Sequence, residues 1–194
     1  MSPRTPQQNE RLRAASREKI VEHALRLFAT HGYERTSVKM IAEAAGVSQG
    51  LLYNYFEGKD ALLRAIFEAS MEDVRASFAA AEAEPDPRRR VEALLRGSFA
   101  IVRRNLHFWR LSYGVRMQAG VLEALGGARL QEWTAAIRAT LERYLRDAGV
   151  PDPGLEAAIL FALIDGVSQH YVLDPDNYPL DEVMARIIAR YDGG

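Results

Sequence analysis

A tight turn at Gly46, between two short helical segments, is the feature of this sequence that most constrains its fold. Ala42, four residues earlier, is small enough to let two helices cross closely, and Leu52 is placed to fill the crossing. Ser37 and Ser48 stand where helix N-caps are expected, one before each segment. This spacing predicts a helix-turn-helix centred on the glycine.

The rest of the chain also carries the period of α-helices. Ser16 is expected to cap the first helix and Gly32 to end it, and a long helix is expected over residues 58–84. Five further amphipathic segments follow, separated by glycine and proline clusters, and none of the chain shows sustained strand alternation. The sequence therefore predicts an all-α fold of about nine helices, in which a three-helix head is joined by a long helix to a helical body.

Composition limits the class of protein. Hydrophobic residues make up 48% of the 194 residues, enough for a sizeable core, and the absence of cysteine excludes disulfides and thiolate metal sites. No run reaches the roughly 18 apolar residues that span a membrane, and the N-terminus lacks an apolar secretory segment. We therefore expect a cytoplasmic protein that has no membrane partner.

Charge is distributed unevenly along the chain. Residues 1–56 contain eight Lys/Arg against five Asp/Glu, a net charge of +3, whereas the remainder has 17 against 21, a net charge of −4. A basic end on a mildly acidic body favours a polyanionic partner at that end.

The stretch "GVSQGLLYNYF" at the second helix of the turn carries polar groups that a core does not need. A short helix of this kind can lie in a DNA major groove, where Gln49 and Asn54 can read adenine edges. Gly50 lets the backbone approach closely, and the rings and hydroxyls of Tyr53 and Tyr55 can contact the sugar-phosphate backbone.

Three flanking residues fit the same interpretation. Ser48 and Thr36 are expected to cap helix starts, where backbone N–H groups favour phosphate, and Lys59 is expected to be a phosphate-binding cation. The alternative for each residue alone is that the tyrosines are core and that Lys59 is a solvated surface lysine. Spacing, turn glycine, aromatic residues and charge together favour DNA binding.

The segment "GYERTSVKMIAEAAGVSQGLLYNYFEGKDALL" resembles the N-terminal DNA-binding domain of the TetR (tetracycline-repressor) family of bacterial transcription regulators. The resemblance runs from about Ile20 to Leu63. It implies an all-α homodimer, with a DNA-binding head and a body that binds a small effector and dimerises. The domains expected are a flexible arm over residues 1–15, a helix-turn-helix DNA-binding domain over residues 16–60, and a ligand-binding and dimerisation domain over residues 61–194.

Residue by residue, the resemblance places Thr36, Ser48, Tyr55 and Lys59 at phosphates and Gln49, Gly50 and Tyr53 at bases. Leu51 departs from the small or hydroxyl residue that is common at its position, which removes one expected phosphate contact. The predicted DNA-binding residues are Thr36, Ser37, Lys39, Ser48, Gln49, Gly50, Leu51, Tyr53, Asn54, Tyr55 and Lys59.

Aromatic residues gather again in "SFAIVRRNLHFWRLSYGVRM", where an apolar pocket between helices is one interpretation and ordinary core packing is the other. Trp109 and Tyr113 lie four residues apart on one helix face, and each has a polar tip that needs a partner. The nearby arginines Arg103, Arg104, Arg110 and Arg116 either attract an anionic or acylated ligand or form a solvated face. The candidate ligand-binding residues are Phe99, His107, Trp109, Tyr113, Met117, Phe161 and Asp165.

Asp165 interrupts an apolar helix, so its carboxylate must find a donor or face an opening. It anchors an effector or serves as a structural acceptor near a dimer interface. Small residues on the same helix, together with apolar residues of the last one, indicate a four-helix interface across a two-fold axis. The candidate interface residues are Ala158, Ala162, Gly166, Gln169, Val183, Ile187 and Tyr191.

The sequence gives no support to an enzyme. The four histidines lack metal-ligand spacing, and no phosphate-binding glycine loop or nucleophile elbow is present, so we expect no cofactor or metal. The function that fits is a ligand-responsive, sequence-specific DNA-binding regulator, a homodimeric repressor that a largely apolar small molecule releases from a palindromic double-stranded operator. The alternatives are a helical regulator that answers to a protein partner or to no small ligand, and a helical interaction protein that does not bind DNA.

Overall fold

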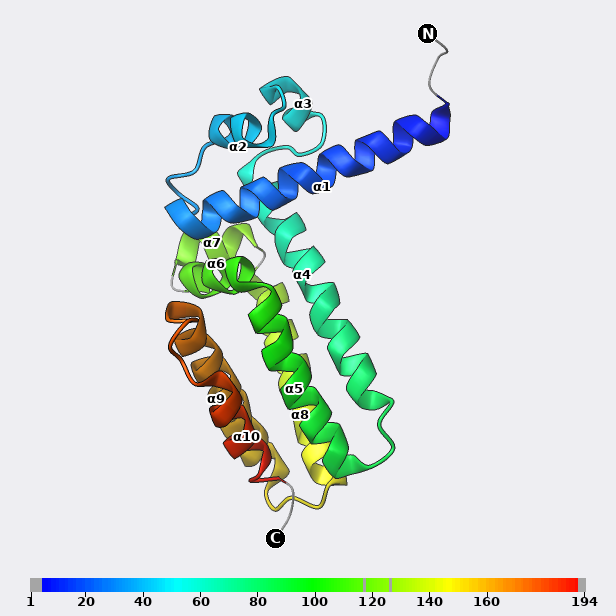
Figure 1. Ribbon diagram of the computed structural model, residues 1–194, viewed down its shortest axis with the longest axis vertical. Coiled ribbons are helices and arrows are strands. Elements are labelled where there is room, and N and C mark those ends of the chain that lie inside the picture. Colours follow the sequence, from blue (N-terminus) through cyan, green and yellow to red (C-terminus); the bar gives the residue numbers. More distant parts are fainter. Residues whose placement is uncertain (1–4, 117, 126, 192–194) are drawn as a thin grey trace.

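The computed structural model describes residues 5–116, 118–125 and 127–191, and every regular element in these ranges is an α-helix (Figure 1). The helices are α1 (Pro6–His31), α2 (Val38–Ala45), α3 (Gln49–Tyr53), α4 (Lys59–Glu82), α5 (Pro87–Arg104), α6 (Leu106–Arg116), α7 (Ala119–Ala124), α8 (Gly127–Asp147), α9 (Pro153–Leu173) and α10 (Leu180–Ile188). The all-α prediction is confirmed, and the short helix α7 comes in addition to the segments that the sequence predicted.

The ends of α2 and α3 follow the sequence prediction. Gly46 has φ 64° and ψ 37°, the left-handed conformation that glycine adopts without steric cost. Ser37 Oγ accepts a hydrogen bond from the N–H of Met40, and Ser48 Oγ accepts one from the N–H of Leu51, so both serines are N-caps. Local chemistry therefore sets the turn of the helix-turn-helix.

The start of α1 differs from the prediction. Thr5 is the N-cap, forms a reciprocal capping box with Gln8, and is followed by Pro6 at the first helical position. Ser16 lies inside the helix, and its hydroxyl donates to the carbonyl of Leu12 instead of capping anything. The predicted cap at Ser16 is therefore wrong, and residues 6–15 belong to α1.

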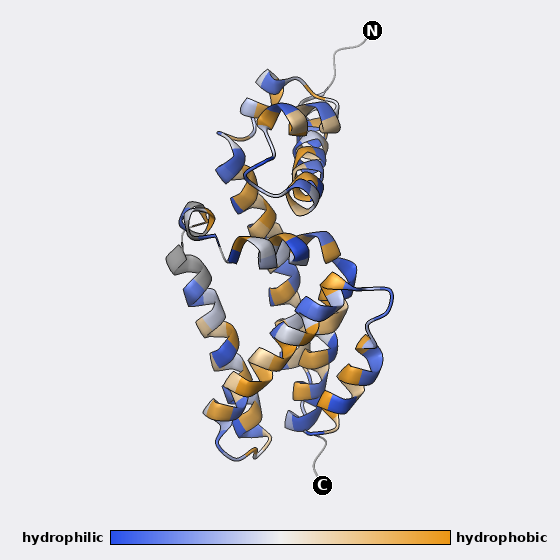
Figure 2. Ribbon diagram, turned by 90° about the vertical axis from the view of Figure 1, so that its left-hand side faces the viewer, coloured by the Kyte–Doolittle hydropathy of each residue, from blue (hydrophilic) through white to orange (hydrophobic). Residues whose placement is uncertain are grey.

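The helices form a head and a body that are joined by α4 (Figure 1). In the head, α1 packs against α2 and α4; below it, α6 and α7 lie across the top of the long helices α5, α8 and α9 (Figures 1 and 2). One buried cluster runs from the head into α4, α6 and α7, and a second fills the body. Trp109 of α6 packs against both clusters, so α6 connects the two cores.

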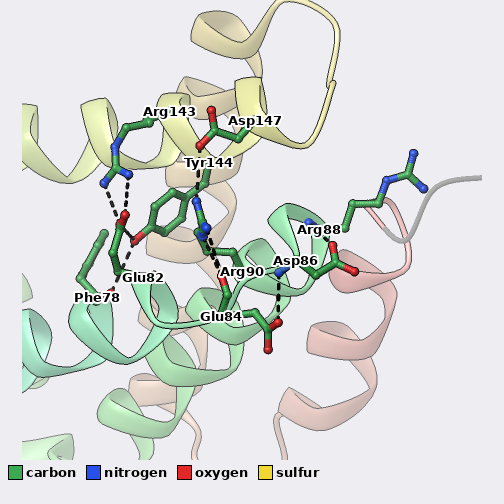
Figure 3. Close-up of polar contacts among 9 residues, drawn as sticks. All are labelled: Phe78, Glu82, Glu84, Asp86, Arg88, Arg90, Arg143, Tyr144 and Asp147. Carbon is green, nitrogen blue, oxygen red and sulfur yellow. Dashed lines mark hydrogen bonds and ion pairs between the residues drawn. The ribbon is translucent and has the colours of Figure 1, made fainter.

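A polar clamp joins the C-terminal end of α4 to α8 (Figure 3). Both carboxylate oxygens of Glu82 accept from the guanidinium of Arg143 at 2.9 Å, and the hydroxyl of Tyr144 donates to Glu82 at 2.5 Å. The hydrogen bond from Arg143, followed by that from Tyr144, lowers the pKa of Glu82 from 4.5 to about 2. Burial and the Glu82 contact raise the pKa of Tyr144 to about 12.

Within the described ranges, none of the helices combines the length and apolar character that crossing a bilayer requires.

Candidate functional site

Helix α3 presents two opposite faces. Leu52 is fully buried and Phe56, just after the helix, is 5% exposed, so these residues anchor the segment to the head core. On the other face Tyr53 is 54% exposed and Leu51 36% exposed. Large side chains that face solvent on a short, well-anchored helix are what a recognition helix requires.

A shallow, open hollow lies beside α3, between the α1–α2 turn and the start of α2. It brings together six of the predicted DNA-binding residues: Thr36, Ser37, Lys39, Gln49, Tyr53 and Lys59. Glu34, Arg35 and Val38 also line it. The sequence analysis did not select Arg35, an exposed cation, although its place directly before Thr36 could have indicated it.

The other predicted DNA-binding residues lie outside this hollow. Ser48, Gly50, Leu51 and Asn54 are exposed on α3 and at its ends. Tyr55 is half-buried and packs against the head core, so only part of its ring faces outward.

Thr36 does not cap a helix. It is 1% exposed, and its hydroxyl donates to the carbonyl of Gly32 at 2.8 Å, with Leu27 O at 3.4 Å. The predicted capping role is wrong because the end of α1, adjacent in space, offers an acceptor. The hydroxyl instead fixes the α1–α2 turn from inside.

Lys59, at the first position of α4, is bound to the same turn. Its Nζ donates to the carbonyls of Tyr33 at 3.0 Å and Glu34 at 3.4 Å, and lies 4.5 Å from the centroid of the Tyr33 ring. The hydroxyl of Tyr33 donates to Asp60, and burial followed by that bond raises the pKa of Tyr33. The start of α4 therefore holds the α1–α2 turn in place.

A second candidate site is a cavity of about 90 Å³ inside the body. Its walls come from α4, α5, α6, α8 and α9, and most are apolar or aromatic, including Phe67, Phe78, Trp133 and Phe161. Both tryptophans of the chain, Trp109 and Trp133, line it. An apolar cavity with a few polar groups is the usual form of a small-molecule site.

The charged residues among its lining side chains are Arg116 and Asp165, which form an ion pair at 2.6 Å with each side chain about one-third exposed. The Arg116 guanidinium also lies 5.0 Å from the centroid of the Tyr113 ring. Burial, followed by the charge of Asp165, raises the pKa of Tyr113. The donor that the sequence required for Asp165 is thus Arg116.

Four of the seven predicted ligand-binding residues line this cavity: Trp109, Tyr113, Phe161 and Asp165. Phe99 is 2% exposed in the body core and His107 is on the surface, so neither lies at the cavity wall. Met117 lies outside the described residues. The serines of the wall, Ser77, Ser98, Ser112 and Ser168, were not selected from the sequence.

The predicted interface residues divide between two environments. On α9, Ala158, Ala162 and Gln169 are exposed and Gly166 is half-buried, and they share that helix with Leu155, 66% exposed, and Ile159, 40% exposed. On α10, Val183 is half-buried and packs against the body core, while Ile187 and Tyr191 are 5% and 8% exposed within the same core. The assignment of Ile187 and Tyr191 to a surface is therefore wrong, since their side chains fill the subunit itself.

No group of three or more His, Cys, Asp or Glu side chains in the described part of the chain could hold a metal ion.

Comparison with known proteins places the head and the body in one family. The family model described as bacterial regulatory proteins, tetR family, matches residues 20–66, and the model described as BetI-type transcriptional repressor, C-terminal, matches residues 87–191. Because the second match alone covers more than half of the sequence, the chain belongs to the TetR family of transcriptional regulators, with a C-terminal part of the BetI type.

Individual relatives agree with this. The HTH-type transcriptional repressor Rv1474c of Mycobacterium tuberculosis is 35% identical over 79 residues, 41% of each chain. The regulator TtgR of Pseudomonas putida is 28% identical over 176 residues, 85% of this chain and 84% of TtgR. A crystal structure of a TetR-like regulator from Rhodococcus sp. RHA1 has a TM-score of 0.78 at 21% identity, covering 98% of this chain and 96% of the other, which shows the shared fold. Family membership makes this protein a DNA-binding transcriptional regulator, not an enzyme.

Proposed function

We propose that the protein is a homodimeric repressor which binds a near-palindromic operator through α3 and leaves it when a small molecule occupies the body cavity. The two heads would enter successive major grooves on one face of the DNA, about 34–36 Å apart. This proposal places the protein in the cytoplasm, where bacterial DNA lies.

The observation that carries the DNA-binding part is the exposed face of α3. Gln49, Leu51 and Tyr53 are exposed on a helix whose buried side is fixed by Leu52. Beside them the hollow contains Lys39, Arg35 and the hydroxyl of Ser37, which are groups that bind phosphate. Gln49 can form paired hydrogen bonds with an adenine edge.

The support for ligand control is the position of the cavity. Phe67 of α4 and Trp109 of α6 line it, and Phe67 also belongs to the core that continues into the head. The rings of Phe67, Phe108 and Trp109 are in contact, with centroids 5.2 Å apart at each step. A molecule that displaced these rings would move α4 and α6, on which α1 rests. It could release DNA only by binding more tightly to a head position that does not fit the operator.

The support for a dimer is the exposed α9 face. Leu155 and Ile159 are large apolar residues, and Ala158, Ala162 and Gly166 between them allow a partner helix to approach closely. A second copy of the same chain, related by a two-fold axis, would cover this face and set the separation of the heads.

A selection experiment tests this proposal. The full chain is incubated with a random-sequence duplex pool, the bound fragments are sequenced, and the complex is weighed by native mass spectrometry. We expect two inverted half-sites, centred about one helical turn apart, with subunits bound in multiples of two. Absence of an enriched sequence, or enrichment of a single half-site bound by one subunit, would contradict it.

A further inference from the structure

The cavity wall contains polar atoms that the protein itself leaves unsatisfied. Trp109 Nε1, Ser77 Oγ and Ser168 Oγ are buried, and among the described residues none of them has a hydrogen-bond partner of ordinary geometry. All three residues line the same cavity. Buried polar groups are nearly always paired in folded proteins, so a cluster of three at one cavity indicates partners that an occupant supplies.

The indole is the most informative of the three groups. A hydroxyl can donate or accept, whereas the indole N–H can only donate. Trp109 is also held in place, because its ring packs against Phe108 at 5.2 Å and Tyr113 at 6.0 Å between centroids. An occupant must therefore offer an acceptor atom to this fixed donor.

The charges at the cavity argue against a charged occupant. Arg116 and Asp165 neutralise one another at 2.6 Å, and a carboxylate or an ammonium ligand would have to separate that pair before either member could bind it. The remaining wall is predominantly apolar and aromatic, which favours an apolar skeleton.

We infer that the cavity takes an uncharged, mainly apolar molecule with an acceptor oxygen, a ketone, ester or ether, that receives the Trp109 N–H. This inference rests on the proposed function, in which the cavity is the effector site, and specifies the chemistry of its ligand.

Two aromatic probes of similar size test it in the full-length protein. Acetophenone has a carbonyl acceptor, toluene has none, and their affinities are measured by titration calorimetry with competition between them to establish a shared site. Trp109→Phe keeps an aromatic ring but removes the N–H. We expect it to lower the ratio of acetophenone affinity to toluene affinity roughly tenfold, the size of one ordinary hydrogen bond, with little change for toluene.

Trp133→Phe is the matched control. It makes the same change of ring in the same cavity, but Trp133 Nε1 is not among the buried atoms without a partner. We expect this variant to leave the affinity ratio unchanged. A similar fall in both variants would mean that ring volume matters rather than the Trp109 donor, and would overturn the inference.

Other results would also overturn it. One is equal ratios in the unmodified protein and the Trp109→Phe variant, which is expected if water satisfies the indole. Others are the absence of any probe binding, and tighter binding of benzoate or benzylammonium than of acetophenone. Operator binding by the same preparations keeps the two proposals apart: retained DNA selection with no acceptor preference rejects the ligand chemistry alone, and loss of DNA selection rejects the proposed function.

Discussion

Lys59 allows a contact that positions the head to be distinguished from a contact with DNA. Its ammonium group donates to the carbonyls of Tyr33 and Glu34 and lies over the Tyr33 ring. A charged hydrogen bond contributes about 1.5–3 kcal/mol and an exposed cation–π contact about 0.5–1 kcal/mol. Because Lys59 is half-exposed and stands at a helix N-terminus, where a cation costs about 0.3–1 kcal/mol, the net contribution is about 1–2 kcal/mol.

Lys59→Met keeps the length of the side chain and removes its charge. We expect the free energy of unfolding, measured by urea denaturation, to fall by about 1–2 kcal/mol, because the α1–α2 turn loses its link to α4. The slope of log affinity for DNA against log salt should change by less than the roughly 0.9 that one phosphate contact contributes.

Lys39→Met is the control for Lys59→Met. Lys39 has a side chain 70% exposed, paired only loosely with Glu43 at 3.9 Å, and it lines the hollow beside α3. It should reduce the salt slope by roughly 0.9 and leave the stability within about 0.5 kcal/mol. If Lys59→Met instead lost a full phosphate contact and kept its denaturation curve, the positioning role would be refuted.

Three other expectations concern the operator, the clamp and the dimer. Gln49→Ala should cost about 1–3 kcal/mol of discrimination at one base pair per half-site, measured on a panel of mutated operators, and a uniform loss across the panel would contradict base reading. Glu82→Gln should destabilise the protein at neutral pH. Folded Glu82 titrates near 2 and unfolded Glu82 near 4.5, so this difference should vanish as the pH falls through that window, whereas exposed Glu57→Gln should show no such pattern. Ala162→Arg should yield monomers in sedimentation analysis and weaken operator binding, and a dimer of unchanged affinity would exclude the α9 face as the interface.

Features set by neighbouring residues could be predicted from the sequence. The left-handed Gly46 and the caps at Ser37 and Ser48 depend on a few adjacent positions, and all three predictions are confirmed. The same reasoning failed at Ser16, because the stronger combination of a capping box at Thr5 and a proline at the next position lies upstream.

Features that depend on how distant segments meet could not be predicted. The acceptor for Thr36 and the carbonyl partners of Lys59 come from the end of α1 and the turn after it. Periodicity places Trp109 and Tyr113 on one face, but which aromatic residues reach the cavity depends on how α5 and α6 cross. Phe99 turned into the core for that reason.

The most direct test of the central claim, that α3 reads a DNA sequence, is fluorescence anisotropy of the full chain on the selected duplex and on a scrambled duplex of equal composition. The account predicts a preference of about 10³-fold or more for the selected duplex, maintained as salt is raised while both affinities fall. Equal affinities that fall in parallel with salt would show that the head binds phosphate without reading bases, and would contradict the account.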